Sequence, residues 1–168
     1  MPDVPLVEIP AAAAVTLNVG VWFLWSVAVG MVGHRLPQRW LRRDRGPLRL
    51  ARWEIGGRVY ERRFAIKRWK DRLPEAGAFF AGGISKRSLD GIDLAQFAVE
   101  TRRAEWVHWG AMLVWPTFGI WNPPWAVGVM FGYAVGANAP CLLVQRYNRA
   151  RLERIMRRRD RRRSGTIS

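Results

Sequence analysis

Uncharged, apolar runs alternate with strongly basic segments along the chain. Residues 9–33 and 106–145 contain no Asp, Glu, Lys or Arg, and every Lys and Arg lies within 35–103 or 146–163. An apolar helix of about 18 residues or more is long enough to cross roughly 30 Å of hydrocarbon. The first run therefore predicts a membrane span over about residues 11–33.

The second apolar run is too long for one span and is interrupted by the segment WNPPW, residues 121–125. Tandem prolines cannot continue a helix, so the run predicts a membrane hairpin with spans at about 105–120 and 124–145. Trp residues at the ends of these spans suit the membrane–water interface. The pattern thus predicts a mainly α integral membrane protein, with three transmembrane helices in a single domain, residues 1–168.

The basic segments set the expected orientation of these spans. The loop 34–104 and the tail 146–168 are rich in Lys and Arg, whereas the N-terminus and the proline turn have neither. The positive-inside rule places both basic segments in the cytoplasm and the N-terminus outside. A cleaved signal peptide is the alternative for the first run, but Asp3 and Glu8 stand where such a peptide needs positive charge.

The basic loop also contains apolar residues in two distinct patterns. In residues 52–60, RWEIGGRVY, a Gly-Gly pair between short alternating runs predicts a β-hairpin. Residues 63–77 mix apolar and cationic side chains, which predicts a segment at the membrane surface, with cations toward anionic lipid headgroups. The glycines and phenylalanines of residues 76–83 predict a loop that dips into the same interface.

Composition narrows the class of protein further. The chain has 168 residues, a formal net charge of +15, 10 Trp and one Cys. A single Cys excludes a disulfide scaffold. A chain this basic can bind nucleic acid. We nevertheless expect no nucleic-acid partner, because membrane topology already explains the two basic segments.

The first candidate for chemistry is the helical segment ETRRAEWVHW, residues 100–109. Glu105 and His108 lie three residues apart on one helical face, where a carboxylate can orient an imidazole that acts as a general base. The alternative is that Glu105 pairs with Arg102 and that His108 is a polar anchor at the interface. We expect no metal, because the Glu-x-x-His pattern occurs once and His34 is the only other histidine.

The second candidate is the segment GANAPCLLVQRYNRAR, residues 136–151. Asn138 lies within a predicted span, so we expect its side chain to bond across helices, and Pro140 frees a backbone carbonyl nearby. Arg146, Arg149 and Arg151 stand at the membrane edge, where guanidinium groups can clamp phosphates with two donors each. The alternative for these arginines is an ordinary stop-transfer anchor.

Several blocks of this sequence occur in one order in a known family. They are GHRLP (33–37), KRWKDRLPEAG (67–77), ETRRAEWVHW (100–109), ANAP (137–140) and VQRYNRARL (144–152). Together they resemble the glycosyl-4,4'-diaponeurosporenoate acyltransferases of staphyloxanthin-type carotenoid synthesis. The resemblance implies a bacterial, multi-pass enzyme of the cytoplasmic membrane. Such an enzyme esterifies a fatty acyl group onto the sugar hydroxyl of a glycosylated carotenoid or related glycolipid.

The resemblance also implies which residues form the site. His34 receives no role, because the corresponding position of the family pattern is variable, and the Arg-rich, Trp-rich composition leaves room for a different lipid acceptor. A His-x-x-x-x-Asp acyltransferase signature is absent, since Leu113 occupies the Asp position after His108. The matched blocks supply His108 and Glu105 as catalytic residues and, as substrate-binding residues, Trp69, Lys70, Glu100, Arg103, Asn138, Gln145, Arg146, Tyr147, Asn148, Arg149 and Arg151.

The resulting hypothesis is acyl transfer at the cytoplasmic membrane face with no bound cofactor. His108, oriented by Glu105, takes the proton of the sugar hydroxyl, and an acyl-thioester such as acyl-CoA is the expected co-substrate. Arg146 and Arg149, with Lys67 or Lys70, hold the donor's phosphates on a wall that faces Glu105 and His108, and Asn138 or Asn148 donates to the oxyanion. Two other classes stay open: a non-enzymatic membrane protein that binds anionic lipids or scaffolds carotenoid enzymes, and an enzyme acting on lipid or phospho-sugar headgroups.

Overall fold

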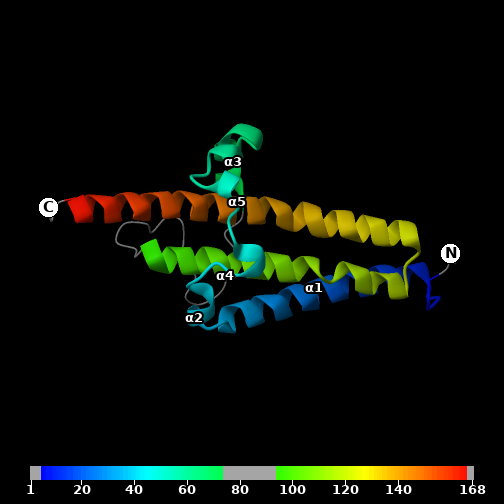
Figure 1. Ribbon diagram of the computed structural model, residues 1–168. Coiled ribbons are helices and arrows are strands. Elements are labelled where there is room, and N and C mark those ends of the chain that lie inside the picture. The colour runs from blue at the N-terminus through cyan, green and yellow to red at the C-terminus, as the bar shows by residue number, and fades with distance from the viewer. Residues whose placement is uncertain (1–4, 74–93, 166–168) are drawn as a thin grey trace. The chain divides into compact units, whose positions relative to one another are not determined.

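The computed structural model describes residues 5–73 and 94–165, and these residues are helical without a strand (Figure 1). The expected mainly α class is therefore confirmed. The α-helices are α1 (Ala11–Arg35), α2 (Gln38–Leu41), α3 (Arg58–Arg63), α4 (Leu94–Met112) and α5 (Pro124–Gly165). The short 3₁₀ helices are η1 (Gly46–Leu48), η2 (Arg52–Glu54), η3 (Ile66–Arg68), η4 (Lys70–Arg72) and η6 (Trp115–Ile120).

The chain divides into two compact units, each built from two separate stretches of sequence. One unit, here the apolar unit, comprises Met1–Arg35 and Trp106–Pro140. The other, the basic unit, comprises Leu36–Glu105 and Cys141–Ser168. Both α4 and α5 thus contribute one part to each unit, with the division near the point where the sequence changes from apolar to basic.

Two helices are long and apolar enough to cross a membrane. They are Ala11–Arg35 and the stretch Pro124–Met156 of α5. Large apolar side chains of α1 such as Phe23 and Leu24, each 66% exposed, point away from the protein. An aqueous surface rarely carries so continuous an apolar face, whereas hydrocarbon favours it. Two of the three expected spans are therefore confirmed as helices of suitable length and composition.

The remaining expected span, residues 105–120, is not a continuous helix. The α-helix α4 ends at Met112, and the following residues form the 3₁₀ helix η6, which has Pro116 near its start. Proline lacks the N–H that an α-helix needs and its ring crowds the preceding turn. Among the described residues this segment is not one of the candidate spans, so the three-span arrangement stays a prediction. The expected break at WNPPW is confirmed, because α5 begins at Pro124.

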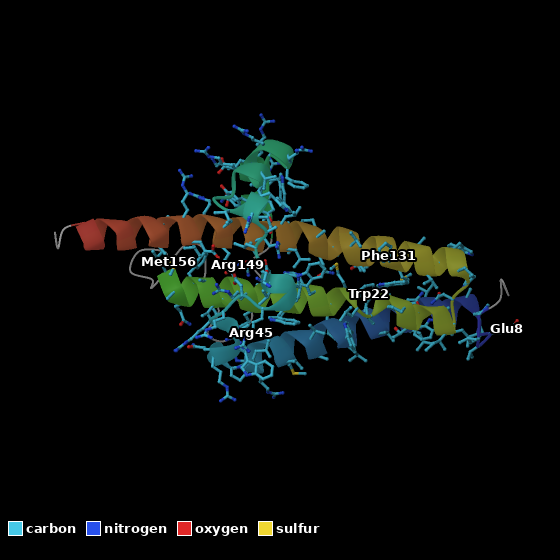
Figure 2. The ribbon with its side chains drawn as sticks, viewed as in Figure 1. Glu8, Trp22, Arg45, Phe131, Arg149 and Met156 are labelled. Carbon is cyan, nitrogen blue, oxygen red and sulfur yellow. The ribbon has the colours of Figure 1, made fainter. Side chains whose placement is uncertain are left out.

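Close helix packing holds the apolar unit together. A Cβ atom added at Gly33 would lie 2.3 Å from Val107 Cγ2, so only glycine lets α1 approach α4 this closely (Figure 1). The ring of Trp22, labelled in Figure 2, packs on Phe118 and Tyr133. The ring centroids are 5.3 and 5.0 Å apart. These contacts join α1 to η6 and to the first part of α5.

Two buried amides of the apolar unit, Asn18 and Asn122, satisfy each other. Asn18 Nδ2 donates to Asn122 Oδ1 at 3.1 Å, and Asn122 Nδ2 donates to Asn18 Oδ1 at 2.9 Å. The indole N–H of Trp121 donates to Asn18 Oδ1 at 2.8 Å. Buried amides need such partners because water is excluded. The network therefore fixes the WNPPW turn against α1.

The basic unit has its own small core. Tyr60, Ile66, Val144 and Tyr147 are all almost fully buried and pack together. This cluster places α3 and η3 against the part of α5 that follows Pro140. Burial of such side chains stabilises the contact by about 1.5–3 kcal/mol per large apolar group. The basic loop is thus folded onto α5 by a hydrophobic core in addition to any contact with lipid.

The predicted β-hairpin over residues 52–60 is wrong. Residues Arg52–Glu54 form η2, and α3 begins at Arg58. The Gly-Gly turn itself is present, with φ of 84° at Gly56 and 75° at Gly57. A Cβ at Gly57 would lie 3.0 Å from the Tyr147 ring, so the turn serves to seat α3 on α5 instead of pairing two strands. The expected interfacial loop at residues 76–83 lies outside the described residues.

Candidate active site

His108 and Asn138 form the polar contact that joins α4 to α5 within the apolar unit. His108 Nδ1 lies 2.9 Å from Asn138 Oδ1. Asn138 is buried, with 8% of its surface exposed, and its Nδ2 donates to the carbonyl of Ala134 at 2.9 Å. The expectation that Asn138 bonds across helices is confirmed.

These two bonds determine which nitrogen of His108 carries the proton. The amide of Asn138 is oriented by its bond to the Ala134 carbonyl, so its oxygen faces the imidazole. An oxygen acceptor at Nδ1 requires an N–H at Nδ1, and in the neutral ring this leaves a lone pair on Nε2. His108 is thereby held in the tautomer that accepts a proton at Nε2, as a general base must.

Glu105 has partners different from the one expected from its spacing to His108. It is fully buried, and its Oε2 accepts a bond of 2.9 Å from Arg149 Nη1. Arg146 Nη1 lies 3.8 Å from Oε1. A buried carboxylate needs a cation or several donors close by, and Arg149 supplies this need. The group that orients Nδ1 of His108 is therefore Asn138, whereas the sequence predicted Glu105. The alternative prediction, a pair between Glu105 and Arg102, is also wrong, because Arg102 pairs with Asp44.

A second buried carboxylate, Glu54, organises the other half of the arginine network in the basic unit. Arg146 donates to it through Nε and Nη2, each at 2.7 Å, and the Tyr60 hydroxyl donates to Oε1. Arg146 also donates to the carbonyls of Pro47 and Arg49. A bidentate arginine–carboxylate pair of this kind fixes geometry as well as charge. The sequence analysis did not select Glu54. The one sequence signal that could have identified it is its position just before the Gly-Gly turn.

Two of the arginines expected to bind phosphates, Arg146 and Arg149, bond instead to groups of the protein itself. Arg149 is fully buried, and it donates to the Leu48 carbonyl as well as to Glu105. Arg146 is committed to Glu54 and to backbone carbonyls. These contacts hold α5 to the loop segments before α3 and give both arginines a structural role, so their binding of substrate phosphates stays a prediction.

The other expected site residues lie in the basic unit with varied surroundings. Arg103 pairs with Glu100 at 3.1 Å and donates to the Leu36 carbonyl. The hydroxyl of the buried Tyr147 donates to Glu61 at 2.9 Å. In the remaining set, Trp69 donates to the Phe64 carbonyl, Lys70 pairs with Asp71, Gln145 and Asn148 are half-buried, and Arg151 is exposed.

The pKa of Glu54 depends on its arginine partner. Burial alone would raise the pKa, but the hydrogen bonds from Arg146 and Tyr60 and the charge of Arg146 outweigh burial and hold the pKa below its ordinary value. Burial and the nearby Glu54 carboxylate raise the pKa of Tyr60. At neutral pH the pair is therefore a carboxylate that accepts from a neutral phenol.

This lowered pKa predicts an acid-sensitive fold in the basic unit. The folded state binds a proton at Glu54 less readily than the unfolded state, so the stabilisation is complete above the ordinary carboxyl pKa and disappears as pH falls through the lower folded value. Thermal unfolding of the purified protein between about pH 6 and pH 3 should show this loss. Glu54→Gln should unfold at lower temperature at pH 6 and lose less on acidification. An unchanged acid dependence in that variant would contradict the assignment.

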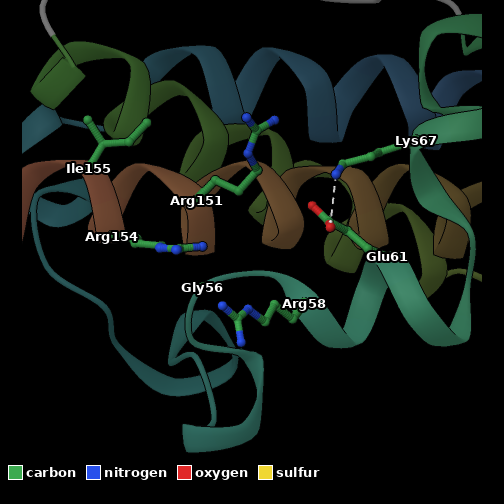
Figure 3. Close-up of a pocket in the computed structure, with 7 residues that line it drawn as sticks. All are labelled: Gly56, Arg58, Glu61, Lys67, Arg151, Arg154 and Ile155. Carbon is green, nitrogen blue, oxygen red and sulfur yellow. Dashed lines mark ion pairs between the residues drawn. The ribbon is translucent and has the colours of Figure 1, made fainter.

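A cavity of about 330 Å³ opens in the basic unit beside α5. Its lining includes Arg58 and Arg154. The sequence analysis did not select these two residues, although a sequence signal was present for each. Arg58 comes directly after the Gly-Gly turn, and Arg154 lies three residues after Arg151 on one helical face. In the described part of the chain no group of three His, Cys, Asp or Glu side chains is placed to hold a metal ion. The full lining is Gly56, Arg58, Glu61, Lys67, Arg151, Arg154 and Ile155 (Figure 3).

Comparison with known proteins now gives the family. The sequence model of the glycosyl-4,4'-diaponeurosporenoate acyltransferase family matches residues 37–158. A protein of that name from Staphylococcus haemolyticus is 38% identical over 104 residues, which cover 60% of this chain and 60% of the relative. Proteins of the same name from two strains of Staphylococcus aureus are 27% identical over 139 residues, covering 81% of this chain and 84% of each relative.

No solved structure matches this chain. The family match spans α2 to α5 and contains both His108 with Asn138 and the arginine network of Glu54 and Glu105. The resemblance inferred from the sequence blocks, and the enzyme class it implied, are confirmed by these relatives. The chain belongs to the glycosyl-4,4'-diaponeurosporenoate acyltransferase family.

Proposed function

We propose that the protein transfers a fatty acyl group from a thioester donor to the sugar hydroxyl of a glycosylated carotenoid or a related glycolipid. The observation that carries this proposal is the His108–Asn138 pair, which leaves Nε2 of His108 with a free lone pair. The names of the relatives support the reaction class and the acceptor. The apolar faces of the two long helices suit an acceptor and a product that stay in lipid.

In the proposed reaction His108 moves one proton between two substrates. Its Nε2 takes the proton of the sugar hydroxyl while the hydroxyl oxygen attacks the acyl carbonyl carbon, forming the new C–O bond. The tetrahedral oxyanion then collapses, the C–S bond breaks, and the imidazolium returns its proton to the leaving thiolate. Asn138 accepts from Nδ1–H throughout, which stabilises the imidazolium and keeps the ring oriented.

The oxyanion donor is a separate group in this scheme. Asn138 directs its amide nitrogen to the Ala134 carbonyl, so the amide serves the histidine first. Asn148, half-buried in α5, stays the candidate donor. Arg103 and Glu100, paired with each other, are the candidates for binding the sugar, and Gln145 can donate or accept for its hydroxyls.

The proposed setting is the bacterial cytoplasmic membrane with the N-terminus outside. The Lys and Arg residues of the loop 34–104 and the tail 146–168 support a cytoplasmic position for both segments. The spans would hold the lipid chains, so the reacting groups meet at the interface while neither lipid leaves the bilayer. Anionic lipids at that surface would attract the exposed cations of both segments.

The reaction is tested by lipid mass spectrometry. Membranes that contain the protein, a glycosylated carotenoid and a long-chain acyl-CoA should accumulate the acyl ester, and matched membranes without the protein should not. The ester should also fail to form when the free fatty acid replaces the thioester, since the proposed step needs a thiolate leaving group. A membrane preparation that binds both lipids but forms no ester would reject acyl transfer and favour the non-enzymatic lipid-binding alternative.

A further inference from the structure

The cavity beside α5 is lined mainly by cations. Arg58 lies at the start of α3, Lys67 in η3, and Arg151 and Arg154 in α5, so three elements direct positive side chains to one space (Figure 3). Glu61 is the one carboxylate among the lining residues of this cavity. The positive charge around the cavity therefore exceeds the negative charge.

Glu61 is already engaged on the wall of the cavity. Lys67 Nζ lies 2.9 Å from Glu61 Oε2, and the Tyr147 hydroxyl donates to Glu61 Oε1 at 2.9 Å. The hydrogen bond from Lys67, the largest cause, and the one from Tyr147 keep the pKa of Glu61 below its ordinary value, so it is ionised at neutral pH. The negative charge of Glu61 is therefore paired with Lys67. It does not fully compensate the positive charges of the arginines that line the cavity.

Two of the arginines are positioned by packing. The guanidinium carbon of Arg151 lies 5.5 Å from the ring centroid of the fully buried Tyr147. The side chain of Arg154 passes the Gly-Gly turn. Its Cδ lies 3.8 Å from the position that a Cβ atom would occupy if Gly56 carried one. The guanidinium of Arg151 is thus placed over the Tyr147 ring and Arg154 runs beside the Gly-Gly turn, and both side chains line the cavity.

No carboxylate neutralises Arg58 or Arg154 within residues 5–73 and 94–156. Like charges gathered in one concave site raise its positive potential and attract a multivalent anion. The planar guanidinium fork is best matched by phosphate oxygens, which accept two bonds at once. The lining offers Ile155 as its one large apolar side chain, so the cavity suits a charged headgroup better than an acyl chain.

We propose that this cavity binds the phosphate groups of a nucleotide-linked acyl-thioester, with Arg58, Arg151, Arg154 and Lys67 as the contacting cations. This assignment rests on the proposed acyl transfer, because it names the donor class for that reaction. A volume of about 330 Å³ is near the lower end of ligand pockets, which extend from roughly 300 to 1,000 Å³. It accommodates the phosphate-bearing part of such a donor, while the acyl chain stays outside in lipid.

The test measures binding of coenzyme A to the full-length protein in uncharged phosphatidylcholine nanodiscs by isothermal titration calorimetry. Arg58→Gln combined with Arg154→Gln should weaken binding by about tenfold or more, the loss of charge-assisted bonds to phosphate. Arg62→Gln, an exposed arginine of α3 outside the lining, is the matched control and should bind as the native protein does. Arg58→Lys with Arg154→Lys keeps the charge and should recover part of the affinity, which separates phosphate recognition from misfolding.

Further probes separate the possible sources of phosphate. Pantetheine, which lacks phosphate, should bind far more weakly than coenzyme A, and inorganic phosphate should compete only at much higher concentration. Equal binding of coenzyme A by the native protein and the Arg58→Gln/Arg154→Gln variant would overturn the proposal. If the protein binds phosphatidylglycerol in nanodiscs but does not bind coenzyme A, the cavity is a site for a lipid headgroup. That result would overturn the donor assignment.

The outcomes also distinguish this proposal from the proposed function. If coenzyme A binding is lost in the variant while the native protein forms no ester, the phosphate site stands and acyl transfer is rejected. If the native protein forms the ester but the variant does so with an unchanged KM for acyl-CoA, acyl transfer stands and the phosphate site is rejected. The proposal expects a raised KM for acyl-CoA with the KM for the acceptor unchanged.

Discussion

Replacing His108 by alanine is expected to lower kcat for ester formation by about 10²–10⁴-fold, the usual contribution of a positioned general base. The Nδ1–H bond to Asn138 at 2.9 Å leaves Nε2 as the proton acceptor, and alanine offers no replacement. Acyl ester formed by membranes containing the variant, measured by mass spectrometry at saturating substrates, checks the result. A variant that retains more than about a tenth of the native rate would exclude His108 as the base.

Variants of Asn138 separate positioning from folding. Asn138→Leu removes the acceptor and should lower kcat while leaving both KM values near their native levels, because only the orientation of the imidazole is lost. Asn138→Asp keeps an oxygen toward Nδ1 and should restore much of the activity. If both variants lose activity together with thermal stability, the residue serves the packing of α4 against α5 and has no separate role in orienting His108.

Replacing Arg149 by methionine should lower the free energy of unfolding by about 3–5 kcal/mol, since it leaves a buried carboxylate without its partner. Arg149 and Glu105 are both fully buried, and Arg149 Nη1 donates to Glu105 Oε2 at 2.9 Å. Denaturant unfolding in detergent micelles, followed by tryptophan fluorescence, measures the change. Loss of stability is expected even in the absence of any substrate.

The double variant Arg149→Met with Glu105→Met tests the physical cause of that loss. Removing both charges should recover most of the stability, because the unpaired buried charge disappears. Asp71→Asn, at the exposed ion pair with Lys70, is the control and should change the free energy of unfolding by less than about 1 kcal/mol. A double variant as unstable as Arg149→Met alone would show that packing of the long arginine side chain dominates.

Features that depend on local sequence could be predicted well. The helix from Ala11 to Arg35 and the start of α5 at Pro124 follow from apolar runs and prolines, which act on their own stretch of chain. Asn138 was identified as a cross-helix contact because a buried amide in an apolar helix needs a partner. In each case the physical constraint is visible within about one turn of helix.

Features that depend on contacts distant in sequence could not be predicted. The spacing of Glu105 and His108 places them on one face, but the partner of Glu105 is Arg149, a residue 44 positions later. The Gly-Gly turn fits a hairpin or a helix start equally well, and only the close approach of Tyr147 to Gly57 decides between them. The cavity cations Arg58 and Arg154 come together for the same reason, since α3 folds back onto α5.

Arg146 and Arg149 have different electrostatic effects before and after folding. In the newly made chain each carries an uncompensated positive charge next to an apolar segment, and by the positive-inside rule we expect such charges to bias the direction of membrane insertion. In the folded protein the same guanidinium groups are bonded to Glu54 and Glu105. Once folding is complete, the positive charges of these two arginines are paired with carboxylates and no longer add to the surface charge. Lysines at these positions would preserve the charge that directs insertion but not the bidentate pairing. We therefore expect the same two arginines to act first in orienting the chain in the membrane and later in holding the folded protein together.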